Sequence, residues 1–145
     1  MIRVVLDTNI IVSAYLNEDG LPFRILKLAL AGSIDLYASE PILEEYKDLL
    51  LRKSYPMDSR RAALLLKKLR NASTLVKPAI QLSETTDPDD NIFLECAQAA
   101  KAEYLVTGNL RHFPTHWKYT RIVLPRQFIE LWGEWRLQSK RPDGS

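Results

Sequence analysis

The chain has 145 residues, of which 46% are hydrophobic and 26% are charged. This length and composition are typical of one globular domain and exclude a largely disordered or membrane-embedded chain. The formal net charge is +2, so no strong imbalance indicates a particular partner. A single cysteine, Cys96, excludes an internal disulfide, and the first apolar run reaches Asp7 too early for a signal peptide. We therefore expect a cytoplasmic protein.

The first half of the chain alternates between predicted strands and helices. Residues 2–6 are apolar, rich in β-branched side chains and without polar alternation, which predicts a central parallel strand covered on both faces. Pro22 and Gly32 bracket an apolar helical pattern, as helix starts and ends often do. The pattern predicts, in order, helices over residues 10–16 and 22–31, a strand over 35–38, and a helix opened by Ser39 or Glu40 and reaching about residue 50.

The second half continues the alternation of strands and helices. The pattern predicts helices over 59–70, 87 to about 102, and 125–137, with short strands over 75–76, 104–106 and 121–123. The last eight residues are polar, and we expect residues 138–145 to form a flexible tail. Such alternation indicates one α/β domain over residues 1–137, with a central, mainly parallel sheet of four to five strands and right-handed crossovers.

Two acids stand where a ligand site of such a sheet is expected. Asp7 follows the first strand directly, and ligands of open α/β sheets bind beyond the carboxyl ends of the strands. Asp7 could equally serve as a helix cap, with Thr8 and Asn9 bonding to neighbouring backbone. Glu45 shares a helical stripe with core residues, and a carboxylate there requires a partner, either a cation or a buried basic side chain. Its neighbour Glu44 lies on another face and needs no special role.

A third acid and a polar turn follow later in the chain. Asp90 precedes Phe93 by three positions on its helix, which predicts that it faces inward. Asp87 is the expected N-cap of that helix, and Asp90 could act both in capping and in binding. Thr107, Gly108 and Asn109 follow the strand over 104–106 at the same sheet edge as Asp7, where Gly108 would permit a tight approach and ordinary turn chemistry is the alternative.

Several carboxylates at one edge would repel one another, and a divalent cation relieves that repulsion. All-oxygen ligand sets favour Mg²⁺ or Mn²⁺ over Zn²⁺. Two such ions about 4 Å apart support in-line attack of water on a phosphodiester. The acids therefore indicate hydrolysis of nucleic acid.

These residues together resemble a PIN domain, and more narrowly the VapC-like toxins of prokaryotic toxin–antitoxin systems. The resemblance rests on four ordered motifs: Leu6-Asp7-Thr8-Asn9, Ser39-Glu40-Pro41-Ile42-Leu43-Glu44-Glu45-Tyr46, Asp87-Pro88-Asp89-Asp90-Asn91 and Val106-Thr107-Gly108-Asn109. It implies a three-layer α/β/α fold and a Mg²⁺- or Mn²⁺-dependent endoribonuclease that is usually a dimer and is inhibited by a small antitoxin. It also implies metal binding and catalysis by Asp7, Glu45 and Asp90, with supporting roles for Thr8, Asn9, Asp87, Thr107 and Asn109.

Asn109 is a departure from the family pattern, because many members place a fourth acid there. The missing charge leaves open whether one or two ions bind. It also leaves open a catalytically weak PIN domain that acts as an RNA- or protein-binding module. A haloacid-dehalogenase-like phosphatase is less favoured, because Asn9 stands where that class requires an Asp, and no Gly-rich motif supports dinucleotide binding.

A basic stretch supplies a candidate RNA-binding surface. Residues 52–70 contain seven Arg or Lys and one acid, Asp58. Such a run suits a polyanion, although a solvated helix face is the commoner explanation. The candidate RNA contacts are Arg52, Lys53, Arg60, Arg61, Lys67 and Lys68.

The remaining candidates are assigned no catalytic chemistry. His112 and His116 fall in a predicted loop, where a surface or phosphate-contact role is the expectation. Packing of the last helix is the expected role of the three tryptophans Trp117, Trp132 and Trp135, with a dimer or antitoxin surface as the alternative.

Overall fold

A six-stranded, mainly parallel sheet lies at the centre of the described chain, with strand order β3-β2-β1-β4-β6-β5. The computed structural model describes residues 1–53, 58–82 and 88–139, and at Lys53, Pro88, Asp89 and Ser139 the backbone alone. Every pair of neighbouring strands is parallel except β5 and β6. The strands are β1 (Arg3–Leu6), β2 (Asp35–Ala38), β3 (Thr74–Leu75), β4 (Tyr104–Val106), β5 (His116–Trp117) and β6 (Thr120–Val123).

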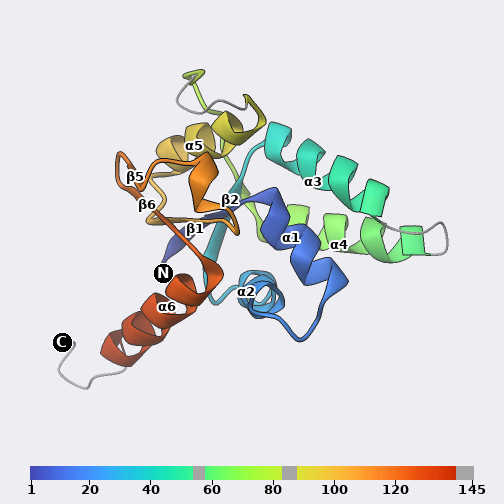
Figure 1. Ribbon diagram of the computed structural model, residues 1–145, viewed down its shortest axis with the longest axis horizontal. Coiled ribbons are helices and arrows are strands. Elements are labelled where there is room, and N and C mark those ends of the chain that lie inside the picture. The colour runs from blue at the N-terminus through green and yellow to red at the C-terminus, as the bar shows by residue number, and fades with distance from the viewer. Residues whose placement is uncertain (54–57, 83–87, 140–145) are drawn as a thin grey trace.

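Helices cover both faces of this sheet, so the fold is the expected three-layer α/β arrangement. In Figure 1, α5 lies above the strands, α2 and α6 lie below them, and α3 and α4 extend beyond α1. A short 3₁₀ helix, Leu110–His112, follows β4. The α-helices are α1 (Thr8–Leu16), α2 (Leu21–Leu30), α3 (Glu40–Lys53), α4 (Ser59–Ala72), α5 (Pro88–Ala100) and α6 (Pro125–Ser139).

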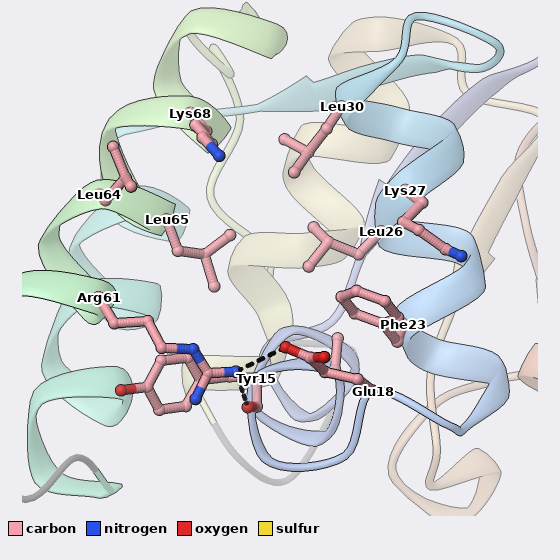
Figure 2. Close-up of a pocket in the computed structure, with 11 residues that line it drawn as sticks. Tyr15, Glu18, Phe23, Leu26, Lys27, Leu30, Arg61, Leu64, Leu65 and Lys68 are labelled. Atoms are coloured by element: carbon pink, nitrogen blue, oxygen red, sulfur yellow. Dashed lines mark hydrogen bonds and ion pairs between the residues drawn. The ribbon is translucent and has the colours of Figure 1, made fainter. Parts of the chain in front are cut away.

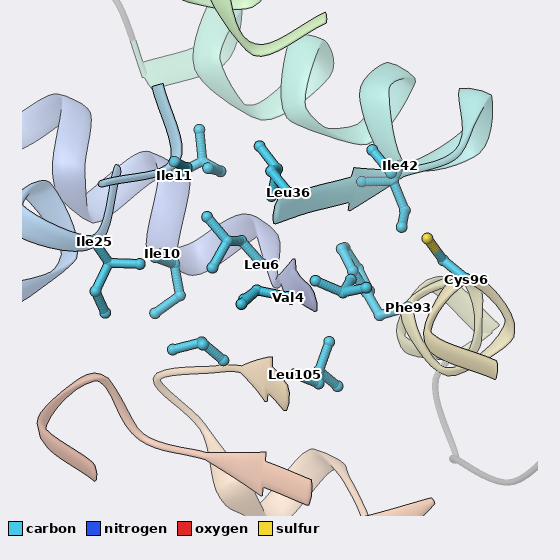
Figure 3. Close-up of a cluster of buried hydrophobic side chains, with 14 of the residues drawn as sticks. Val4, Leu6, Ile10, Ile11, Ile25, Leu36, Ile42, Phe93, Cys96 and Leu105 are labelled. Carbon is cyan, nitrogen blue, oxygen red and sulfur yellow. The ribbon is translucent and has the colours of Figure 1, made fainter. Parts of the chain in front are cut away.

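The central strands are buried on both faces, as their sequence predicts. Val4, Val5 and Leu6 are inaccessible to solvent, which explains why β1 shows no polar alternation. Figure 3 shows apolar side chains from the strands meeting those of the covering helices, among them Ile10 of α1. Cys96 of α5 also belongs to this core, and its burial raises the pKa of the thiol to about 12. The carboxyl ends of the strands are thus held by a closely packed core.

Helix ends agree with local sequence signals. The hydroxyl of Ser39 accepts a bond from the Ile42 amide, so Ser39 caps α3 and Glu40 is its first residue. Gly32 has φ +76° after α2, and the amides of Gly32 and Ser33 donate to Ala29 and Leu28 in a Schellman motif. Glycine adopts that left-handed conformation without steric cost.

Some predicted boundaries were wrong. The sheet has one strand more than expected, because β5 is a two-residue antiparallel strand that no hydrophobic pattern marks. α1 begins at Thr8, two residues before the expected start, because Asp7 caps it. α6 continues through Ser139, so Gln138 and Ser139 belong to a helix and not to a tail. Residues 140–145 and the expected cap Asp87 lie outside the described residues. No helix in the described ranges is long and apolar enough to cross a membrane.

Candidate active site

Asp7 joins the end of β1 to the start of α1. Its Oδ1 accepts a hydrogen bond of 2.8 Å from the Thr8 amide, and its Oδ2 accepts one of 2.8 Å from the Thr107 hydroxyl. The residue is the N-cap of α1 and also lines a surface hollow. The cap role of Asp7 is confirmed, and it leaves a ligand role open, since capping occupies one lone pair of a carboxylate that has four.

Asp7 is buried, with 7% of the residue exposed. Burial raises the pKa of its carboxyl above the ordinary value, because the charged form loses hydration. The bonds from the Thr107 hydroxyl and the Thr8 amide oppose that effect, as does the charge of His112 when it is protonated. Asp7 is thus a site where negative charge is costly in the absence of a cation.

Glu45 enters the same hollow from the first half of α3. Its Oε2 accepts a hydrogen bond from the Thr8 hydroxyl, so Thr8 contacts one acid through its amide and the other through its side chain. The next residue, Tyr46, is fully buried and its hydroxyl donates to the Leu6 carbonyl. Burial, aided by the nearby acids, raises the pKa of Tyr46 well above its ordinary value and keeps the phenol protonated. That bond fixes α3 against the end of β1.

Asp90 reaches the hollow from the first turn of α5. Its side chain is 13% exposed, and its Oδ2 lies 3.2 Å from His112 Nδ1. The other ring nitrogen of His112, Nε2, lies 3.0 Å from the side-chain nitrogen of Asn109, Nδ2. From the sequence we expected a surface or phosphate-contact role for His112 and did not predict its contact with Asp90, a candidate metal ligand.

The turn after β4 connects these side chains through Asn9 and Thr107. Gly108 donates its amide to Asn9 Oδ1 at 3.0 Å, and the Asn109 amide donates to the Thr107 hydroxyl at 3.0 Å. The expected close approach at Gly108 was wrong: an added Cβ would lie 3.5 Å from Asn9 Oδ1, an ordinary contact, and φ is not positive. The turn is held to α1 by the hydrogen bond from the Gly108 N–H to Asn9, and not by the absence of a side chain at Gly108.

Asp7, Glu45 and Asp90 all line one hollow of about 520 Å³ at the carboxyl ends of the strands. Sequence reasoning gave Glu44 no role, and Glu44 is indeed exposed, yet it lines the rim of this hollow together with Asp48. A spacing of four positions on α3 could have indicated that pair. The lining consists of Asp7, Thr8, Asn9, Pro41, Glu44, Glu45, Asp48, Leu49, Arg52, Asp90, Ile92 and His112.

The donor set of this hollow fits Mg²⁺ or Mn²⁺ in kind, because its three inner acids present oxygen ligands. Across residues 1–53, 58–82 and 88–139, no three Asp, Glu, His or Cys side chains converge into a ready-made metal cluster. Each acid is instead held by a protein donor, namely a Thr hydroxyl or His112. The three acids fit a cation by their chemistry and their shared location. To bind it together, they would have to exchange their hydrogen bonds with the Thr hydroxyls and His112 for bonds to the cation.

The predicted basic surface is divided between two places. Arg52 lines the acidic hollow, whereas Arg61 and Lys68 line a second hollow of about 310 Å³ between α1, α2 and α4 (Figure 2). Arg61 donates to the Tyr15 carbonyl at 2.8 Å and lies 4.3 Å from the centre of its ring. Arg60 and Lys67 are exposed. The described basic side chains of residues 52–70 therefore do not form one continuous helix face.

The three tryptophans are partly buried and pack against the core. Trp117 Nε1 donates to Gln98 Oε1 at 3.1 Å, which joins β5 to α5. Trp132 Nε1 is buried and has no hydrogen-bond partner among the described residues. Packing of the last helix describes Trp132 and Trp135, which lie on α6, but not Trp117, which lies on β5.

Comparison with known proteins agrees with this architecture. A model of the PIN domain family matches residues 3–111. The uncharacterized protein MJ1680 of the archaeon Methanocaldococcus jannaschii is 34% identical over 142 residues, which cover 89% of this chain and 90% of that protein. The chain belongs to the PIN domain family. PIN domains are generally metal-dependent nucleases.

Proposed function

We propose that this protein is a Mg²⁺- or Mn²⁺-dependent endoribonuclease that hydrolyses RNA phosphodiester bonds. The observation that carries the proposal is the meeting of Asp7, Glu45 and Asp90 in one hollow at the carboxyl ends of the parallel strands. The raised pKa of Asp7 supports it, because the cost of charge at that carboxyl falls when a cation is near.

The metal ligands in this proposal are Asp7, Glu45 and Asp90, for one or two ions. A bound divalent cation supplies charge neutralisation at the phosphate and activation of a water for in-line attack. The chain's own residues orient the ligands: Thr107 bonds to Asp7, Thr8 bonds to both Asp7 and Glu45, and Asn9 holds the turn after β4. Asp87, which lies outside the described residues, is kept as a supporting residue.

Arg52 is the predicted RNA contact best placed for the reaction, because it lines the same hollow as the acids. A guanidinium there can pair with a phosphate that flanks the scissile bond. The exposed side chains of Arg60 and Lys67 remain candidates for contacts farther along the RNA.

We further propose that the protein is the toxin of a toxin–antitoxin pair, acts in the cytoplasm as a homodimer, and is inhibited by a small antitoxin. This part rests on the resemblance of the four motifs to VapC-like toxins. Growth arrest by the wild-type gene in a bacterial host, absent with Glu45→Gln, would support it. Undiminished growth with an active nuclease would contradict the toxin role.

The nuclease proposal is tested with purified protein, a labelled structured RNA, and Mg²⁺ or Mn²⁺, with EDTA as a control. Glu45→Gln and Glu44→Gln form a matched pair, because they remove the same charge at adjacent positions of α3. We expect Glu45→Gln and Asp90→Ala to abolish cleavage and Glu44→Gln to retain most of it. Equal loss in the Glu44 and Glu45 variants would contradict the assignment of Glu45.

A binding module is the second candidate, because Asn109 stands at a position where many relatives carry an acid and the described acids form no ready-made cluster. In that case RNA binds with a strong salt dependence, and neither metal produces cleavage. The same assay, run beside a binding titration at several salt concentrations, separates the two functions.

A further inference from the structure

The segment that follows β4, residues 107–112, contacts two of the three candidate metal ligands. At its start, Thr107 is fully buried and its hydroxyl donates to Asp7 Oδ2. At its end, His112 lies against Asp90 Oδ2. Asn109 is bonded to both ends, through its amide N–H to Thr107 and through its side chain to His112.

The Asn109 side chain favours one tautomer of His112. Its NH₂ group lies 3.0 Å from His112 Nε2 and can only donate, so the two groups form a hydrogen bond when Nε2 accepts. A neutral imidazole that accepts at Nε2 carries its proton on Nδ1. That N–H then points to Asp90 Oδ2 at 3.2 Å. The chain of bonds therefore runs in one direction, from Asn109 through His112 to Asp90.

We propose that Asn109 and His112 are a positioning pair that orients Asp90 for the divalent cation, with Asn109 holding the His112 proton on Nδ1. This inference rests on the proposed metal-dependent function. In this assignment Asn109 acts on a metal ligand through His112. It is not itself a fourth metal ligand that has lost its charge. Groups that bond to metal ligands from behind commonly set ligand orientation and metal affinity.

An acid at position 109 would not hold the proton of a neutral His112 on Nδ1. A carboxylate accepts hydrogen bonds, so it would draw the proton of a neutral His112 to Nε2. The lone pair of Nδ1 would then face the Asp90 carboxylate and repel it. The amide at Asn109 and the imidazole at His112 are therefore chemically matched, which explains why an amide suits this chain.

The first test observes the proton itself, in the metal-free protein and without RNA. The chain has two histidines, His112 and His116, so a ¹⁵N-labelled sample gives two imidazole spectra, and His116→Asn identifies which is which. The spectra are recorded about two pH units above the ordinary His pKa of about 6.5. We expect the Nδ1–H tautomer for His112, and a shift towards Nε2–H in Asn109→Ala. A wild-type His112 in the Nε2–H form would overturn the inference.

The second test measures Mn²⁺ affinity by calorimetry, again without RNA. An Asn side chain places its NH₂ near the position of Nδ1, whereas Gln reaches the position of Nε2. We expect about 10- to 100-fold weaker binding for His112→Ala and His112→Gln, and affinity close to wild type for His112→Asn. His112 is half exposed, so its variants should unfold at the wild-type temperature, and the thermal transition checks this.

A double-mutant cycle tests the order of the pair. If Asn109 acts through His112, then Asn109→Ala weakens Mn²⁺ binding in the wild-type background and has no further effect in His112→Ala. Additive losses, or unchanged affinity in His112→Ala while the wild type binds Mn²⁺, would overturn the positioning pair and leave the nuclease proposal standing. A wild type that binds no Mn²⁺ would overturn both.

Discussion

The two hollows at opposite ends of α1 differ in the groups that bond to their charged side chains. At the start of α1, acids are bonded to the hydroxyls of Thr8 and Thr107 and to an imidazole. At its end, the guanidinium of Arg61 is bonded to a carbonyl, stacked on the Tyr15 ring and paired with Glu18 at 3.4 Å. The two Thr hydroxyls leave the negative charges of Asp7 and Glu45 in place, whereas Arg61 and Glu18 offset each other. We therefore expect changes in the acidic hollow to affect activity and changes in the second hollow to affect stability.

The largest expected effect on activity is that of a substitution at Asp7, in the acidic hollow. Asp7→Asn keeps the size of the side chain and removes the charge, so cleavage should fall by about 1,000-fold, or ~4 kcal/mol of transition-state stabilisation. The free energy of unfolding should not fall by more than about 1 kcal/mol, because Asn can still accept the Thr8 amide. Single-turnover cleavage and urea denaturation measure the two quantities. Cleavage that survived this change would contradict the site assignment.

Leu26→Ala is the corresponding change in the second hollow. Leu26 is buried and lines that hollow, so its truncation should lower the free energy of unfolding by about 2–5 kcal/mol. The cleavage rate per folded molecule should remain that of the wild type. Leu64→Ala is the matched control, because Leu64 lines the same hollow and is 53% exposed; it should change stability by less than about 0.5 kcal/mol. A loss of cleavage by folded Leu26→Ala would show that the hollows are coupled.

Arg61→Ala and Arg60→Ala sharpen the comparison within the predicted RNA-binding stretch. The contacts of Arg61 with Tyr15 should make its loss cost about 1–2 kcal/mol of stability, while loss of the exposed Arg60 should cost less than about 0.5 kcal/mol. If Arg60 contacts phosphate, its removal should lower the salt dependence of RNA binding by about one unit of slope. Unchanged RNA binding in the Arg60 variant would remove it from the interface.

The smallest expected effect is the pH dependence that Asp7 contributes to the metal-free protein. Its folded pKa is raised, so the folded state holds the proton more tightly than the unfolded state. Stability should therefore fall as pH rises from the unfolded value, about 3.9, through the raised folded value. One group contributes at most about 1.4 kcal/mol per pH unit. Thr107→Val should extend this fall to higher pH, because the Thr107 bond lowers the pKa, and Asp7→Asn should abolish it. Unfolding curves at a series of pH values measure the slope.

Most of the sheet could be predicted from the sequence, and the reasons are visible in particular residues. Val4, Val5 and Leu6 are buried on both faces, so the chain shows an uninterrupted apolar run there. β2 and β4 were predicted with their observed bounds for the same reason. β5 was missed because two residues carry no periodicity, and their pairing with β6 depends on the turn between them.

The candidate site was predicted less completely than the fold. Asp7, Glu45 and Asp90 could be found, because strand ends and helical stripes determine where such residues point. The bond between His112 and Asp90 could not, since 22 positions separate the two residues and the path of the intervening chain sets the contact. The position of Arg61 beside Tyr15 likewise follows from the packing of α4 on α1 and not from the run of charges.

The buried thiol on α5 gives the fold a built-in reporter of opening. Cys96 is the one cysteine in the sequence, it is inaccessible to solvent, and its pKa is raised to about 12. A thiol reagent reacts with the thiolate form, so modification requires α5 to leave the sheet and Cys96 to regain an ordinary pKa. The rate of thiol labelling therefore follows the fraction of molecules in which α5 is detached. Because Asp90 lies on the same helix, slower labelling on addition of Mn²⁺ would measure how strongly the cation holds that helix in place.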